Sequence, residues 1–146
     1  MSEFTAEIRW QHTPRDGHPD DYSRAHDWQL AGGQTLRASS APEYAGDPTR
    51  TNPEEALVAA VSSCHMLTFL AVAAKRGVKV TSYTDKASGS LGKNAEGRLA
   101  VTEVVLRPQI TFDGAAPGAE ELTKLHEAAH RNCFIGNSIT GNVRVA

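Results

Sequence analysis

The chain has 146 residues, of which 40% are hydrophobic and 22% charged, which fits one globular domain and disfavours a disordered chain. Its formal net charge is −2 at pH 7, with basic and acidic residues spread along the chain, which disfavours binding to nucleic acid or to an anionic membrane. The start, MSEFTAEIRW, lacks the basic flank and apolar run of a secretory signal, so we expect a cytoplasmic protein.

Alternating apolar and polar residues predict antiparallel strands in the first part of the chain. One alternation covers residues 4–10, a second covers 22–30, and a glycine pair leads into a third strand at 35–38. Residues 41–51 contain proline and glycine and are expected to form an irregular loop. In the second strand, period-two alternation puts these side chains on one face: Tyr22, Arg24, His26, Trp28 and Leu30.

A long helix is expected next. Residues 56–74 contain no Asp, Glu, Lys or Arg, a length of about 28 Å if helical. The segment has a polar centre, Ser-Ser-Cys-His, and no interfacial aromatic belt, so we predict a buried helix of a soluble protein rather than a membrane span. Asn52 and Pro53 form the start signal, and Lys75-Arg76-Gly77 forms the stop.

The remainder predicts a hairpin, a second helix and a last strand. The strand candidates are 78–89 and 98–112, joined through a Gly-Lys-Asn turn. A Gly/Pro-rich turn then precedes a helix at 119–131, and a strand follows at 142–145. The fold class is therefore α+β, with antiparallel strands packed on two helices in a single domain, 1–146.

Two cysteines, Cys64 and Cys133, are the candidate reactive groups, because cysteines in a reducing compartment are more often catalytic, redox-active or metal-binding than structural. Cys64 lies too deep in its helix for the helix dipole to activate it, so a cation must come from elsewhere. Arg24 is the best candidate, and Glu54 is a candidate partner for it. Three alternatives stay open: an inert buried Cys64, a solvent-directed Arg24, and Glu54 as a helix-start charge.

A histidine stripe offers another possibility. His126, His130 and Cys133 follow helical spacing, and with Cys64 they have the residue types of a tetrahedral zinc site. The alternative is a polar helix face. His65 is rotated by about 100° from Cys64 around a helix, which makes it a poor base for the thiol, and we assign it a structural role. No phosphate loop, nucleophile elbow or dinucleotide fingerprint is present.

Two regions resemble the OsmC/Ohr family of thiol-dependent hydroperoxide reductases. Asn-Pro-Glu-Glu-Ala at 52–56 precedes Ser-Ser-Cys-His at 62–65, and Ala-His-Arg-Asn-Cys-Phe-Ile-Gly-Asn-Ser occupies 129–138. The resemblance extends from 22 to 145, and its specificity lies in the combination of the two regions. Phe134 stands where many members have proline, and Ser-Ser-Cys-His-Met is typical of a less studied OsmC-like branch.

The resemblance implies an OsmC-like fold with a long buried central helix, in an intertwined homodimer with active sites at the subunit interface. It identifies Cys64 as the peroxidatic cysteine, Cys133 as the resolving cysteine and Glu54 as the glutamate that holds the catalytic arginine. Arg24 best matches that arginine, with Arg37 and Arg50 as alternatives.

The implied activity is reduction of organic hydroperoxides to alcohols, without metal or organic cofactor. Cys64 becomes a sulfenic acid, Cys133 converts it to a disulfide, and an external dithiol, typically a lipoyl group, restores both thiols. Aromatic side chains at the mouth of the site would favour organic over hydrogen peroxide; the expected ones are Phe69, Trp28 and Phe134.

The helix itself adds one inference. Glu54 and Cys64 are ten residues apart, about 15 Å along a helix axis, so one arginine cannot readily reach both in the same chain. We therefore expect Glu54 and Arg24 to act on Cys64 of the partner subunit. Two other functions stay open: a non-catalytic thiol or zinc-binding module, and an acyl- or lipid-binding protein whose thiols only line a pocket.

Overall fold

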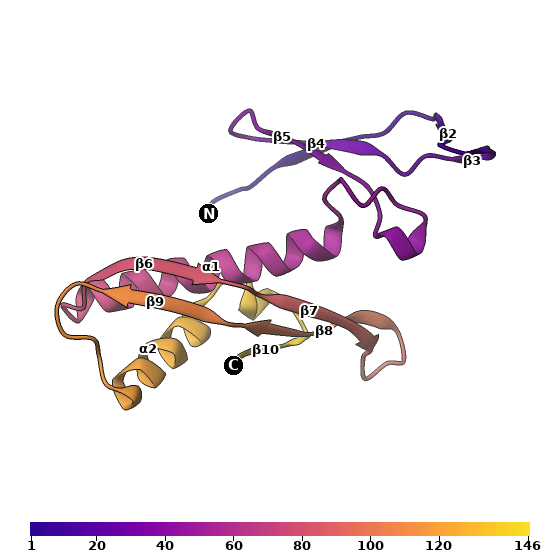
Figure 1. The fold of residues 1–146 in the computed structure, drawn as a ribbon. Coiled ribbons are helices and arrows are strands. Elements are labelled where there is room, and N and C mark those ends of the chain that lie inside the picture. The colour runs from indigo at the N-terminus through magenta and orange to yellow at the C-terminus, as the bar shows by residue number, and fades with distance from the viewer. The chain divides into compact units, whose positions relative to one another are not determined.

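The computed structural model describes residues 1–146, which form two compact units, Met1–Ala56 and Leu57–Ala146. The first unit contains five strands and the first turn of the long helix α1 (Figure 1). The second contains the rest of α1, five strands and the helix α2. The α+β class is confirmed.

The predicted N-terminal meander is present as an antiparallel sheet of order β1-β4-β5. The alternation at 22–30, however, does not form one strand. It is interrupted at 23–25, where the carbonyls of Ser23 and Arg24 bond to side chains and the Ser23 N–H donates to the Thr13 carbonyl. The part before the break pairs in a separate hairpin. The bounds are β1 (Ala6–Arg9), β2 (Pro14–Arg15), β3 (His18–Tyr22), β4 (His26–Leu30), β5 (Thr35–Ala38) and the short helix η1 (Pro42–Tyr44).

Helix α1 (Pro53–Lys75) begins and ends where the sequence predicts. The Asn52 side chain accepts a hydrogen bond from the Glu55 backbone N–H at 2.9 Å, and the Glu55 carboxylate accepts one from the Asn52 N–H at 2.9 Å. This reciprocal capping box satisfies two N–H groups at the helix start. Gly77, with φ of 71°, ends the helix in the left-handed conformation.

Two opposite faces of α1 differ in burial. Val61, His65, Phe69 and Ala73 are buried at every fourth position. The opposite face of the helix is exposed and carries no charge; its residues are Ala59, Ser63, Leu67 and Ala71. The helix is long and apolar enough to cross a membrane by length and composition. Only 22% of its most apolar window is buried inside the chain, so within one chain the helix is less buried than the sequence predicts. A core helix of a soluble protein meets the same criterion.

The predicted long hairpin is broken into four strands: β6 (Val80–Asp85), β7 (Ser88–Lys93), β8 (Leu99–Leu106) and β9 (Pro108–Phe112). Both predicted strands are interrupted near Asp85. The Asp85 carboxylate accepts a hydrogen bond from the Ser62 hydroxyl at 2.5 Å and another from the Arg107 backbone N–H at 2.6 Å. β7 pairs with β8 and β6 with β9, and β10 (Asn142–Val145) adds to β8 in parallel. The strand predicted at 142–145 is confirmed.

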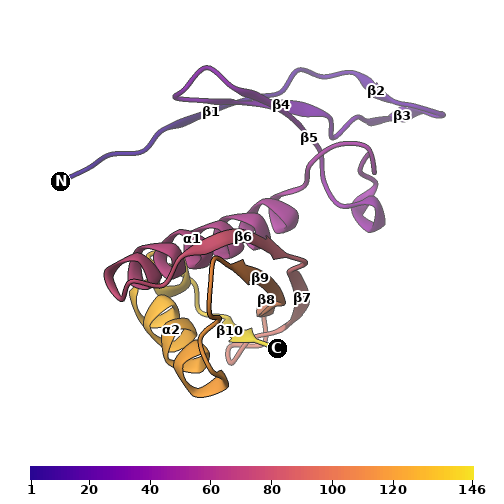
Figure 2. The same cartoon turned by 60° about the vertical axis from the view of Figure 1, so that its left-hand side comes forward.

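Helix α2 (Ala119–Asn132) completes the second unit. Its Leu125 and Ala129 pack with Phe69 and Ala73 of α1, and apolar side chains of β6 and β9 pack against this cluster. Figure 2 shows α2 beside α1. A second cluster joins α1 to β8 and β10 through Val61, Val104, Leu106 and Val143. Both clusters use the buried face of α1.

Phe69→Ala is expected to destabilise the protein by about 3 to 5 kcal/mol, because it removes a fully buried ring from the centre of the first cluster and leaves a cavity. Urea unfolding followed by far-UV circular dichroism would measure the change. Leu99→Ala is the control, since Leu99 is 67% exposed and its truncation should cost well under about 1 kcal/mol. Equal losses in both variants would contradict this account of the core.

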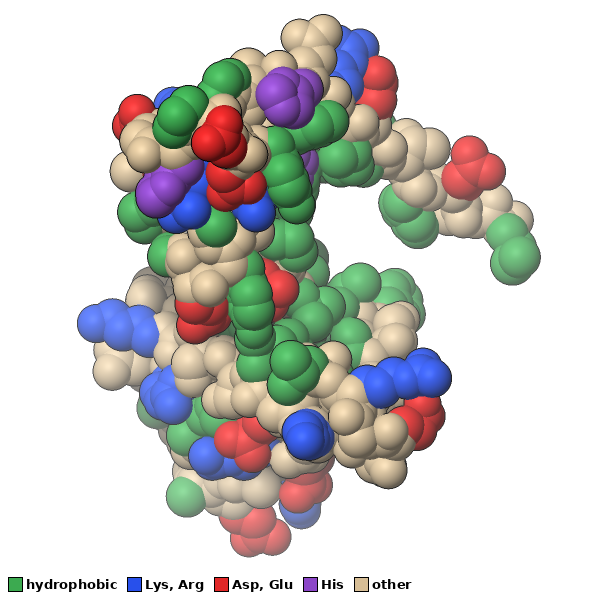
Figure 3. Space-filling view, turned by 90° about the vertical axis from the view of Figure 1, so that its right-hand side faces the viewer, with side chains coloured by type: hydrophobic (Ala, Val, Ile, Leu, Met, Phe, Trp, Pro, Cys, Tyr) green, Lys and Arg blue, Asp and Glu red, His purple; other side chains and the backbone are tan.

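Charges on the face drawn in Figure 3 do not gather by sign: acidic and basic side chains are both scattered over it. This agrees with the small net charge of the chain.

Candidate active site

The structure brings the two cysteines together. Cys64 lies on α1 and is partly exposed, whereas Cys133 follows the last turn of α2 and is buried. Both are free thiols, and Cys64 lies close enough to Cys133 to raise the pKa of its thiol. Residues 69 positions apart in the sequence thus form a dithiol pair within the second unit.

The surroundings of Cys133 keep it protonated. Burial raises the pKa of the Cys133 thiol, and the neighbouring Cys64 raises it further, while the Gly136 and Ile135 N–H groups oppose the shift. The Gly136 N–H donates to the Cys133 sulfur at 3.3 Å. A thiol with a raised pKa is a poor first nucleophile, which suits Cys133 to the second step of a dithiol reaction.

Arg24 has a carboxylate partner, but not the predicted one. Its Nη1 donates to Asp21 Oδ2 at 2.6 Å and to the Tyr22 carbonyl at 2.5 Å, and its guanidinium lies 3.9 Å from the centre of the Tyr22 ring. The hydrogen bond from Arg24 holds the pKa of Asp21 below its ordinary value. The expected pairing of Arg24 with Glu54 is not formed within the chain. Asp21, three residues before Arg24, was missed because the alternation implied one continuous strand.

Arg24 and Glu54 nevertheless line the same pocket of the first unit, a cavity of about 600 Å³. The Glu54 Oε2 atom is buried there without a hydrogen-bond partner. Most of the remaining wall is apolar or aromatic, and it includes Ile8, Trp10, Tyr22, Ala41 and Tyr44. The sequence did not single out Trp10 or Tyr44.

Of the two alternative arginines, Arg50 does not line this pocket and has partners of its own. It donates to the His26 carbonyl at 3.2 Å and lies 3.6 Å from an Asp27 carboxylate oxygen and 3.8 Å from one of Asp47. Arg37 is exposed on β5, and neither arginine lines the pocket. Among the three candidates, only Arg24 is a pocket residue.

Of the three aromatic residues expected at the mouth of the site, Phe69 is contradicted by the structure. Phe69 is fully buried in the core, where it contacts His126 and Tyr83. Trp28 lies outside the pocket, and Phe134 is 81% exposed. The uniformly apolar composition of α1 gives no indication of which face is buried, so the pattern could not place Phe69.

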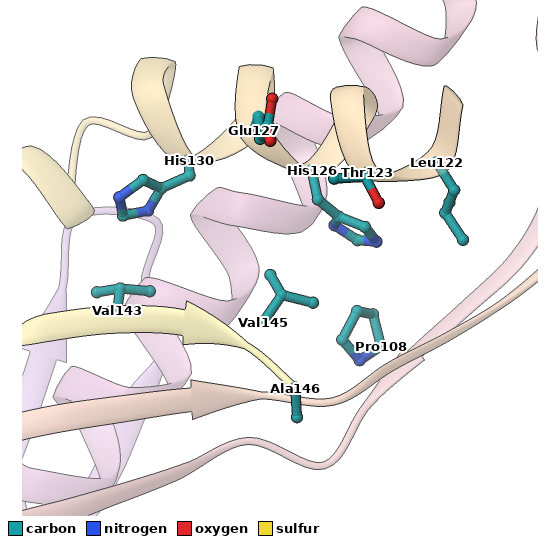
Figure 4. A pocket seen from close by; sticks show the side chains of 9 residues that line it. All are labelled: Pro108, Leu122, Thr123, His126, Glu127, His130, Val143, Val145 and Ala146. Atoms are coloured by element: carbon teal, nitrogen blue, oxygen red, sulfur yellow. The ribbon is translucent and has the colours of Figure 1, made fainter. Parts of the chain in front are cut away.

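His65 pairs with His126, which supports its structural assignment. The ring nitrogens Nε2 of His65 and Nδ1 of His126 lie 3.0 Å apart, and the two rings are stacked. His126 and His130 point from α2 into a pocket of about 460 Å³ that Val143 and Val145 line on the opposite side (Figure 4). The structure contains no group of three or more His, Cys, Asp or Glu able to hold a metal, so Cys64, His126, His130 and Cys133 do not form the zinc site that the sequence left open as an alternative.

The buried histidine pair predicts a loss of stability in mild acid. Burial, with the nearby His126 and His130, lowers the pKa of His65 from 6.5 to about 4, and burial also lowers the pKa of His126. Between these pH values the unfolded chain binds the proton and the folded chain does not. The free energy of unfolding is therefore highest above pH 6.5, where His65 is neutral in both states, and it decreases as the pH falls from 6.5 towards 4.

Urea unfolding at several pH values should show about 2 kcal/mol less stability at pH 5 than at pH 7 from His65 alone. His65→Phe should flatten this dependence, and His18→Asn, on the exposed strand β3, should leave it unchanged. A wild-type protein whose stability is constant from pH 7 to 5 would contradict the assignment.

Comparison with known proteins agrees with the fold. Residues 46–146 match the family model described as OsmC-like protein. The structure resembles that of an OsmC-like protein of unknown function from Vibrio cholerae, with 46% sequence identity, a TM-score of 0.91 and coverage of 100% of this chain and 99% of that one.

Two more distant relatives are informative. An organic hydroperoxide resistance protein, OsmC, from Legionella pneumophila shares the fold with a TM-score of 0.74 at 22% identity, over 99% of this chain and 94% of that one. The uncharacterized protein YmaD of Bacillus subtilis is 24% identical over 119 residues, which are 80% of this chain and 79% of YmaD. The family match includes both cysteines and Glu54 but not Arg24. On the family model, the sequence identity and the shared fold, the chain belongs to the OsmC-like family.

Proposed function

We propose that this protein is a thiol-dependent peroxidase that reduces organic hydroperoxides to alcohols with Cys64 and Cys133. The observation that carries the proposal is that two free thiols from different helices are neighbours, and that the buried one, Cys133, has a raised pKa. Membership of a family that includes organic hydroperoxide resistance proteins adds support.

The proposed reaction has three steps. The Cys64 thiolate attacks the hydroperoxide, so that a sulfur–oxygen bond forms, the O–O bond breaks, and the leaving alkoxide takes a proton to become the alcohol. The Cys133 sulfur then attacks the Cys64 sulfenic acid, water leaves, and a disulfide forms. An external dithiol, for which we propose a lipoyl group, reduces the disulfide and is itself oxidised. No metal or organic cofactor takes part.

Arg24 would supply the positive charge that favours the Cys64 thiolate and the departing alkoxide. Glu54 would hold the arginine, and its unpartnered buried oxygen is consistent with a partner that is not engaged within the single chain. We propose that both residues serve Cys64 of the partner subunit. The exposed, uncharged face of α1 would be covered in that homodimer, and residues 1–146 would then act as a single OsmC-like domain in the cytoplasm.

The apolar and aromatic wall of the Arg24 pocket supports a preference for organic substrates. We expect the second-order rate constant for an alkyl hydroperoxide to exceed that for hydrogen peroxide by about tenfold or more, since apolar burial of a few methyl groups supplies this difference. Stopped-flow measurement with both peroxides checks this, and equal rate constants would contradict the role of the pocket.

The decisive test of the function treats reduced protein with one equivalent of an alkyl hydroperoxide near neutral pH. Intact mass and thiol titration should show rapid loss of both thiols and a decrease of about 2 Da, the signature of a disulfide. One equivalent of alcohol should appear. Thiols that persist for minutes would contradict the proposal.

A further inference from the structure

The segment that carries Arg24 is held by a backbone hydrogen bond, from the Ser23 N–H to the Thr13 carbonyl at 2.8 Å, and by side chains. Ser23, Arg24 and Ala25 lie between β3 and β4 and belong to no strand. The Trp10 indole N–H donates to the Ser23 carbonyl at 2.8 Å. The next carbonyl, that of Arg24, lies 2.8 Å from Nδ1 of His26. Two consecutive carbonyls are therefore each held by an aromatic ring nitrogen.

The hydrogen bonds of His26 define its tautomer. Trp28 Nε1 is 3.0 Å from His26 Nε2, and an indole N–H can only donate, so His26 Nε2 accepts. The Arg24 carbonyl can only accept, so His26 Nδ1 carries the proton and donates to it. His26 is thus neutral and uses both nitrogens, in a chain of hydrogen bonds from Trp28 through His26 to the Arg24 backbone.

Arg24 is consequently held at both ends. Asp21 and the Tyr22 carbonyl hold its guanidinium, and His26 holds its own carbonyl. His26 also lines the pocket with Arg24 and Glu54. A backbone rotation at Arg24 would move the guanidinium, and a shift of about 1 Å in a charged group at a reaction centre can reduce the rate a hundredfold.

We propose that His26 is a positioning residue that, through its Nδ1 proton, sets the place of the Arg24 guanidinium in the pocket. The proposal rests on the proposed function for its catalytic consequence. Trp28 contributes by selecting the tautomer that donates. His26 itself acts through Arg24 and takes no part in bond making.

Two substitutions separate the donor from the ring. His26→Leu removes the donor, whereas His26→Asn puts an amide N–H at about the position of Nδ1. The rate of Cys64 oxidation by an alkyl hydroperoxide should fall about tenfold to a hundredfold in His26→Leu and stay within about threefold of wild type in His26→Asn. Equal loss in both variants, or no loss in His26→Leu, would overturn the proposal.

A second readout does not depend on peroxidase activity. Trypsin cleaves after arginine, so the rate of cutting between Arg24 and Ala25, read by mass spectrometry, reports how firmly this segment is held. We expect faster cutting at this bond in His26→Leu than in wild type and His26→Asn, with cutting after the exposed Arg98 unchanged. If wild type fails to reduce hydroperoxides but this pattern holds, the proposed function fails and the clamp on Arg24 stands.

The tautomer can be tested on the unaltered protein, which removes any doubt about folding of the variants. Long-range proton–nitrogen NMR spectra distinguish the two neutral forms of histidine. The His26 ring should show a protonated Nδ1 and an unprotonated Nε2. The opposite tautomer would overturn the proposal, because Nδ1 would then be unable to donate to the Arg24 carbonyl.

Discussion

Cys64→Ser is expected to abolish hydroperoxide reduction, with at least about a thousandfold loss of rate, whereas Cys133→Ser should retain the first turnover and stop there. A serine hydroxyl is far less ionised and less nucleophilic than a cysteine thiol at neutral pH, so the O–O bond is no longer attacked. In Cys133→Ser the attack on peroxide proceeds, but no second thiol is available to remove the sulfenic acid.

The measurement is peroxide consumption in a single turnover without added thiol, together with mass spectrometry after dimedone treatment. Dimedone should label Cys64 in the Cys133→Ser protein and should not label Cys64→Ser. Far-UV circular dichroism of both variants checks folding. Rapid peroxide consumption by Cys64→Ser, or the absence of a dimedone adduct in Cys133→Ser, would contradict the assigned roles.

Mixing two inactive variants should restore activity if the site is shared between subunits. In a mixed dimer of Cys64→Ser and Glu54→Ala chains, the chain with intact Glu54 serves the intact Cys64 of its partner. One of the two sites is then complete, so random mixing should give about a quarter of wild-type activity. Each parent homodimer should be at least about tenfold below wild type, since each lacks a required group at both sites.

Arg24→Met can replace Glu54→Ala in the same experiment and should complement Cys64→Ser equally well. A matched control mixes Cys64→Ser with Cys133→Ser, whose dimers retain no more than the single turnover. The chains are mixed after mild denaturation, and subunit exchange is confirmed by native mass spectrometry. Activity no higher than the parents in exchanged dimers would mean that Arg24 and Glu54 do not act across the interface.

Local signals in the sequence were sufficient for the helices. The start of α1 depends on Asn52 and Glu55, and its end on Gly77, which are all near neighbours of the helix. The last strand and the β7–β8 hairpin were also predictable from pattern. These elements are set by capping, turn chemistry and periodicity, which act over a few residues.

The features that could not be predicted from the sequence depend on contacts between residues far apart in the chain. The break after Tyr22 needs the Trp10 indole, thirteen residues from Ser23. The pairing of His65 with His126 joins two helices 61 residues apart. The contact of Cys64 with Cys133 is longer in range still, and spacing alone cannot determine whether two cysteines approach.

Because Glu55 closes the capping box, the start of α1 does not depend on the carboxylate of Glu54. The two adjacent glutamates therefore have different roles: Glu55 stabilises the start of the helix, and Glu54 lines the pocket. Varying position 54 alone would alter the polarity of the cavity without weakening the helix that frames it. A change at position 54 therefore reports on the pocket and on the arginine that Glu54 is proposed to hold, and not on the start of the helix.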